Sequence, residues 1–127
     1  MARRNEENIV RQTEQIAMGC AMGGLLEMLT RPWTLHILWL LSHNGPMRFG
    51  ALRRAAEGIS ARLLTVRLRT LEERGFVERS VRATNPPEVT YIPTPRLKDM
   101  EGFMRQLHTL SDKWQVEDRM KHEGKAA

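Results

Sequence analysis

The spacing of apolar and polar residues along the chain predicts a series of helices interrupted by one pair of strands. Residues 33–42 are apolar on most sides, which is typical of a helix at the centre of a small domain. Pro32 suits the first position of this helix, because the N–H that proline lacks has no partner there. Upstream, residues 9–18 have loose helical character. A break is expected after them, at Gly19, Gly23 and Gly24.

Two more helices are predicted between the turn at residues 43–46 and Gly75. The first covers residues 48–56. The second begins after Ser60, a strong N-cap residue, and runs to about Arg74, where the glycine that follows ends it.

The helix that follows Ser60 carries one apolar stripe. Leu64, Leu68 and Leu71 recur at intervals of four and three residues, so they share one face and are expected to be buried. At 100° per residue, the opposite face is expected to be exposed. It holds Arg62, Val66 and Arg69, with Thr65 and Thr70 beside them.

A β-hairpin and a last helix complete the predicted fold. Residues 76–82 and 89–92 are expected as strands, and the prolines of residues 85–87 mark the hairpin tip, since proline cannot donate to a strand ladder. The last helix begins near residue 94 and runs to about residue 120. The predicted fold class is mainly α with a small β-hairpin (α+β), a winged helix-turn-helix with N- and C-terminal dimerisation helices.

The last helix has an apolar seam whose members are spaced by four, three and four residues. This heptad-like spacing suits packing against another helix. The seam is the predicted dimer interface: Phe103, Leu107, Leu110 and Trp114.

The 127 residues, 41% of them hydrophobic, fit one domain with a small core. The expected organisation is an arm or helix at residues 1–19, the winged-helix domain at 20–120 and a disordered tail at 121–127. No apolar run reaches the ~18 residues of a membrane span, and the N-terminus has no apolar signal core. The single Cys20 cannot form an internal disulfide, which favours a reducing, cytoplasmic setting.

The net charge is concentrated in residues 48–82, which hold nine Arg, no Lys and four Glu. This stretch carries the whole net charge of +5 of the chain. A compact domain with one Arg-rich region points to a phosphate-bearing partner. An α-helix fits the DNA major groove. There Arg can form two hydrogen bonds with guanine, Thr can donate a hydrogen bond or place its methyl group against thymine, and Val can only make an apolar contact. The candidate DNA-binding residues are Arg48, Arg53, Ser60, Arg62, Thr65, Val66, Arg69, Arg79 and Arg82.

Several runs of residues together resemble one family. They are Trp33-Thr34, Gly45-Pro46-Met47-Arg48-Phe49-Gly50-Ala51-Leu52, Gly58-Ile59-Ser60-Ala61-Arg62-Leu63-Leu64-Thr65, Arg67-Leu68-Arg69-Thr70-Leu71-Glu72-Glu73-Arg74-Gly75, Pro86-Pro87-Glu88-Val89-Thr90-Tyr91 and Thr94-Pro95. In this order they resemble the HxlR-type transcriptional regulators over residues 20–114. The resemblance implies a dimeric, bacterial winged-helix DNA-binding protein, usually a repressor, whose terminal helices build the dimer. Two departures are Val66, where a polar residue is common, and Glu88, where Arg is frequent.

Other interpretations stay open beside this one. Cys20 stands where some members of that family sense oxidants or electrophiles, but no basic residue is near it in sequence to favour a thiolate, so a small buried residue near the dimer interface is the preferred interpretation. The methionines of the terminal segments either fill the core or line a ligand pocket: Met18, Met22, Met28, Met100 and Met104. The four histidines and one cysteine have no metal-ligand spacing, and no cofactor or catalytic motif is present.

The functional hypotheses are three. The preferred one is a homodimeric regulator on a pseudo-palindromic duplex operator, with an effector that is unknown. The second is a winged-helix module that contacts protein instead of DNA, in which case the outward helix face would be apolar or acidic. The third is a small enzyme, against which the lack of clustered catalytic residues argues.

Overall fold

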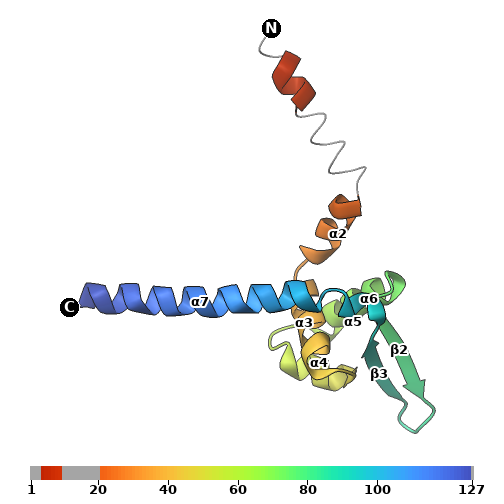
Figure 1. Ribbon diagram of the computed structural model, residues 1–127. Helices are drawn as coiled ribbons and strands as arrows, with labels where there is room; N and C mark the ends of the chain where they lie inside the picture. Colours follow the sequence, from red (N-terminus) through yellow and green to blue (C-terminus); the bar gives the residue numbers. More distant parts are fainter. Residues whose placement is uncertain (1–3, 10–20, 127) are drawn as a thin grey trace.

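A computed structural model describes residues 4–9 and 21–126, and it has the predicted class of fold (Figure 1). Residues 4–9 are helical. The other helices are α2 (Ala21–Leu29), α3 (Thr34–Asn44), α4 (Phe49–Ala55), α5 (Ala61–Glu73), α6 (Pro95–Lys98) and α7 (Glu101–Ala126). The strands are β1 (Met47–Arg48), β2 (Val77–Arg82) and β3 (Glu88–Pro93). Helices therefore dominate, and the β2–β3 hairpin projects from them as a wing.

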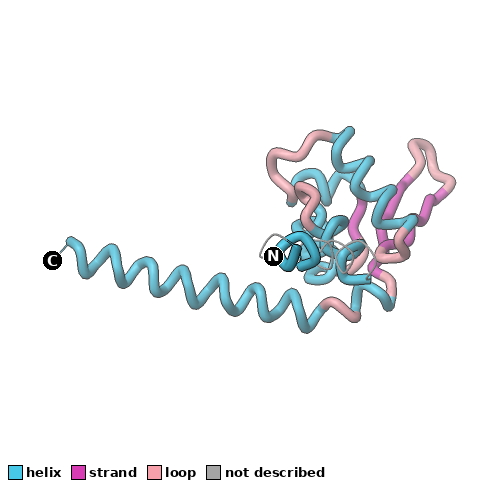
Figure 2. Tube along the Cα trace, turned by 90° about the horizontal axis from the view of Figure 1, so that it is seen from above, coloured by secondary structure: helices cyan, strands magenta, loops and turns pink. Residues whose placement is uncertain are grey.

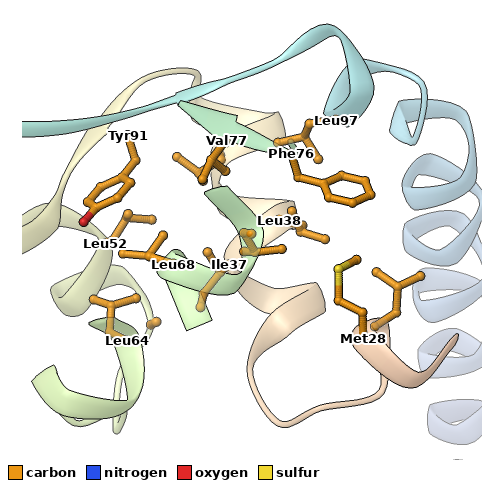
Figure 3. Close-up of a cluster of buried hydrophobic side chains, with 14 of the residues drawn as sticks. Met28, Ile37, Leu38, Leu52, Leu64, Leu68, Phe76, Val77, Tyr91 and Leu97 are labelled. Atoms are coloured by element: carbon orange, nitrogen blue, oxygen red, sulfur yellow. The ribbon is translucent and has the colours of Figure 1, made fainter. Parts of the chain in front are cut away.

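Helix α3 lies at the centre of the core, as its apolar sequence predicts. Its Ile37, Leu38 and Leu41 are fully buried. The predicted stripe of α5 packs on the same cluster, where Leu64 and Leu68 point inward (Figure 3). Residues from every other part of the domain close the cluster: Met28, Leu52, Phe76, Val77, Tyr91, Leu97 and Met104. A single core thus fixes the rotation of α5 about its own axis.

The sheet has three strands where the sequence predicts two. Their order is β1-β3-β2, and both pairings are antiparallel. Arg48 lies in β1, opposite Thr90, and not in the first turn of a helix over residues 48–56 as predicted. The reason is that Met47 and Arg48 find ladder partners in β3, some forty residues later, and α4 starts only at Phe49.

The segment before α3 also differs from its prediction. Gly23 and Gly24 lie inside α2 and do not break it, while Gly19 and residues 10–18 lie outside the described residues. Pro32 does not begin α3, because Trp33 has a left-handed backbone (φ 73°) and the helix starts at Thr34. Helix α2 ends at Leu29, and the N–H of Arg31 donates to the Met28 carbonyl, three residues back, where the chain leaves the α-helical pattern.

The predicted last helix is two helices. The backbone N–H of Met100 donates to the Leu97 carbonyl, three residues back, and this tight turn separates α6 from α7. The turn lets both Leu97 and Met104 reach the core, where each is buried. Helix α7 then continues to Ala126, past the predicted end near residue 120 and through most of the predicted disordered tail. Gly124 alone is too weak a breaker to stop it.

Helix α7 leaves the body of the domain after its first turns (Figure 2). Met104 is buried in the core, and the ring of His108 stacks on Trp39 of α3 with centroids 5.2 Å apart. The 26 residues of α7 span ~39 Å at 1.5 Å per residue, and residues 105–125 are exposed, so most of the helix has no packed neighbour among the described residues. None of the helices in the described part of the chain has the length and hydropathy to cross a membrane.

Candidate nucleic-acid interface

Helix α5 presents the face that the leucine stripe leaves free. Arg62 and Arg69 are exposed, and the side chain of Val66 is 44% exposed between them. This is the arrangement predicted from the 100° rotation per residue, because Leu64 and Leu68 hold the opposite face in the core. The exposed face of α5 combines two long cations with one apolar side chain.

Thr65 sits at the edge of this face and is half-buried. Its hydroxyl donates to the Ala61 carbonyl at 2.8 Å, within the same helix. The proton of that hydroxyl is therefore in use, and Thr65 offers a partner an oxygen acceptor and a methyl group. Thr65 was predicted either to donate a hydrogen bond to a base or to contact a thymine methyl group. The hydrogen bond to Ala61 competes with the first of these roles and leaves the second unaffected.

Ser60 caps the N-terminus of α5 as predicted. Its backbone is extended (φ −75°, ψ 153°), and its hydroxyl oxygen accepts from the Leu63 N–H at 3.1 Å. Because the oxygen is the acceptor, the O–H of Ser60 stays available to donate outward. The first N–H groups of a helix also favour an anion at this end.

An open groove of about 850 Å³ runs between α5 and the wing. Four of the candidate residues line it: Arg48, Thr65, Arg69 and Arg79. The hairpin tip at residues 84–87 forms one end, and two carboxylates, Glu72 and Glu88, lie among the arginines. The fold thus brings together cations from β1, α5 and β2, which are far apart in the sequence.

Glu88 pairs with one arginine of the groove, Arg48, and with Arg82 beside it, contacts that the sequence analysis did not predict. Its carboxylate is 3.1 Å from the guanidinium of Arg48 and 3.9 Å from that of Arg82. In the ladder, Arg82 is directly opposite Glu88, and Arg48 approaches from β1 on the other side of β3. The opposite charges on either side of the predicted tip could have indicated the Arg82 contact from sequence alone, since cross-strand neighbours interact.

The remaining candidate residues lie outside the groove lining. Arg62 and Val66 are on the exposed side of α5, Ser60 is exposed at the cap before it, and Arg82 is at the exposed end of β2. Arg53 is exposed on α4 and borders a separate shallow pocket with Gly50, Arg54 and Glu57.

One arginine of the basic stretch has a structural role. The Nε of Arg67 donates to the Pro32 carbonyl at 2.8 Å and ties α5 to the loop before α3. Its half-buried side chain therefore belongs to the fold, although its charge counts in the +5 of residues 48–82.

The predicted seam of α7 is solvent-exposed in the single chain. Phe103, Leu107, Leu110 and Trp114 have exposed fractions between 37% and 54%. Val116 and Met120 are also exposed, but at 100° per residue they point away from this seam.

The cysteine and methionine predictions have different outcomes. Met28 and Met104 are core residues, Met100 packs against the core, and Met22 is exposed. Cys20 and Met18 lie outside the described residues, so a sensing role for Cys20 stays a prediction.

The helix pair α4–α5 followed by a β-hairpin is a winged helix-turn-helix. Comparison with known proteins agrees: residues 28–119 match the HxlR-like helix-turn-helix family. The HTH-type transcriptional regulator sll1512 of Synechocystis sp. is 33% identical over 95 residues, which cover 75% of this chain and 70% of that protein.

Solved structures of transcriptional regulators are also similar to this chain. The transcriptional regulator ytfH from Salmonella typhimurium is 29% identical, with a TM-score of 0.68 over 82% of this chain and 92% of that one. The reduced form of YodB from B. subtilis is 26% identical, with a TM-score of 0.64 over 74% and 92% of the two chains. The chain belongs to the HxlR-like helix-turn-helix family, and it is a transcriptional regulator with a DNA-binding fold, not an enzyme.

The cap on α5 leads to a stability prediction. Ser60→Ala removes the acceptor for the Leu63 N–H and is expected to lower the free energy of unfolding by about 1 kcal/mol. Ser60→Asp keeps an acceptor at the positive end of the helix and is expected to retain that stability. Urea denaturation followed by circular dichroism measures both, with Ser80→Ala on the exposed part of β2 as the control. Equal stability of Ser60→Ala and the wild type would contradict the capping role.

Proposed function

We propose that this regulator binds pseudo-palindromic duplex DNA in a sequence-specific way, as a homodimer, and represses transcription. The observation that carries the proposal is the exposed face of α5, with Arg62, Val66 and Arg69 beside a groove that the wing closes. Each protomer would insert α5 into a major groove and lay the wing over the neighbouring backbone.

The chemistry of the α5 face supports base recognition. Arg62 and Arg69 have the planar donors that pair with guanine O6 and N7, and Val66 offers an apolar contact for a thymine methyl group. An outward face of this composition argues against a module that only contacts protein, for which an apolar or acidic face was the expectation.

The surrounding cations suit phosphate contacts. Arg48, Arg79 and Arg82 flank α5 along the sheet, and Arg53 lies on the preceding helix. Together with the Ser60 hydroxyl at the N-terminus of α5, they would fix the register of the protein on the duplex. Phosphate contacts of this kind carry no sequence information, so discrimination would rest on α5.

The apolar seam of α7 supports the dimer. Phe103, Leu107, Leu110 and Trp114 repeat along one side of a helix that projects from the domain. A single winged helix reads few base pairs, so pairing of two protomers gives useful specificity and matches a pseudo-palindromic site.

We propose the bacterial cytoplasm as the location of this protein, because transcription takes place there. A repressor would act by occupying its operator in competition with the transcription machinery.

Duplex binding is expected to depend steeply on salt. Each phosphate contact contributes about −0.9 to the slope of log K against log salt. Fluorescence anisotropy of a duplex selected from a random library measures that slope. The proposal fails if no binding occurs at low salt, or if the affinity does not change across the salt series.

Substitutions on α5 and on the wing are expected to have different effects. Arg62→Ala and Arg69→Ala should each reduce discrimination between selected and random duplex by about 1–3 kcal/mol, the value of a bidentate base contact. Arg82→Ala should weaken both duplexes alike, because a phosphate contact is independent of sequence. Competition binding separates these outcomes. A uniform loss in all three variants would show that α5 does not face the bases.

The dimer is tested by placing charges on the α7 seam. Leu107→Glu/Leu110→Glu would bring like charges together between two helices, and we expect a monomer of 14.7 kDa in sedimentation equilibrium. Thr109→Glu/Val116→Glu, at exposed positions on the side of α7 opposite the seam, is the matched control and should remain a dimer. A wild-type chain that sediments as a monomer at micromolar concentration would exclude this interface.

A further inference from the structure

We propose that Glu88 competes with DNA phosphate for Arg48 and Arg82. In the free protein its carboxylate holds both guanidinium groups, at 3.1 and 3.9 Å. When duplex DNA binds, at least one arginine leaves the carboxylate for a phosphate. The inference rests on the proposed DNA-binding function and adds a residue that limits the affinity for any duplex.

The position of Glu88 makes it the least exposed member of this cluster. Its side chain is 32% exposed, against 62% for Arg48 and 78% for Arg82. It lies on β3, the central strand of the sheet, between the strands that carry the two arginines. The guanidinium groups are therefore open to a partner from solvent, while the carboxylate stays at the edge of the groove.

The interaction is also weak enough to exchange. Ion pairs between exposed side chains contribute little to stability and are screened by salt. A DNA phosphate offers the same guanidinium groups an anion of high local charge density. The free energy of breaking the contact with Glu88, and the repulsion between its carboxylate and the phosphate, both reduce the affinity for DNA.

Glu88 reduces the affinity for every duplex by the same factor, because a phosphate contact does not depend on the base sequence. Glu88 would thus lower binding to random DNA, which competes with the operator throughout a genome. The protein would keep its arginines ordered at the wing without holding non-operator DNA tightly.

The experiment compares Glu88→Gln with Glu78→Gln. Both remove one negative charge from the wing, and their side chains lie on the same face of the hairpin, four strand positions apart by register. That separation is ~13 Å, more than the ~10 Å Debye length at 0.1 M salt. Glu78 is exposed, and among the described residues no arginine is paired with it. It therefore controls for charge without releasing an arginine.

The probe is a fluorescein-labelled duplex of mixed sequence, about 30 base pairs long, enough for two half-sites one helical turn apart. Anisotropy is measured from about 50 to 300 mM salt, the range over which phosphate contacts dominate. At about 100 mM salt, Glu88→Gln should bind roughly 5- to 10-fold tighter, with a slope steeper by about 0.9, the equivalent of one additional phosphate contact. Glu78→Gln should change the affinity by less than about twofold.

A double-mutant cycle shows whether the effect acts through the arginines. In an Arg48→Ala/Arg82→Ala background, Glu88→Gln should increase the affinity clearly less than it does in the wild type, because only the repulsion between its carboxylate and the phosphate is then relieved; an equal increase in both backgrounds would overturn the competition for the arginines. Glu88→Thr, with a residue that suits a strand, should reproduce Glu88→Gln, and thermal melting of each variant without DNA confirms that it is folded.

The results distinguish a failure of the competition by Glu88 from a failure of the proposed DNA binding. If the wild type binds and Glu88→Gln binds equally or more weakly, Glu88 does not compete with phosphate, while the proposed DNA binding stands. If neither the wild type nor any variant binds the duplex, both the competition and the proposed function are overturned.

Discussion

The burial of one leucine stripe determines how α5 can work. Leu64, Leu68 and Leu71 are held against the centre of the core, so α5 cannot rotate without exposing them. Truncating a single buried leucine costs about 2–5 kcal/mol, a large part of the stability of a small domain. The same contacts therefore hold Arg62 and Val66 outward. The face that we propose for base contact is a consequence of packing on its opposite side.

The wing depends on a second constraint, the pairing of its hairpin with a strand from a distant part of the chain. Strand β3 pairs with β2 along the hairpin and with β1 at the start of α4. This brings Arg48 next to the wing and puts Glu88 between two arginines. The groove beside α5 thus contains cations and carboxylates together, and its net attraction for phosphate depends on which of them are paired.

Sequence reasoning succeeded where the information is local. The cap at Ser60, the periodic leucines of α5 and the stop at Gly75 are all contained in a few consecutive residues, and they predicted the helix and its exposed face. The hairpin was predicted for the same reason, because the prolines near its tip exclude a regular ladder there. The resemblance to a known family, which spans most of the chain, pointed to the same fold.

The failures concern contacts between distant segments. A two-residue strand such as β1 has no periodicity of its own and exists only because β3 lies beside it. The turn between α6 and α7 follows from the need to bury both Leu97 and Met104. The start of α3 was misplaced at Pro32, because Trp33 takes a left-handed conformation and the helix begins only after it. Helix propensities of the single residues do not indicate this conformation of Trp33.

Amide hydrogen exchange of the full chain with and without bound duplex tests the DNA-facing surface most directly. With duplex bound, exchange should slow in the N-terminal half of α5, residues 60–69, and around the hairpin tip, residues 82–88. Exchange in α7 should be the same in the free and bound protein, because that helix is assigned to the dimer. Protection confined to residues 101–126, with none in α5, would contradict the assignment of α5 as the recognition helix.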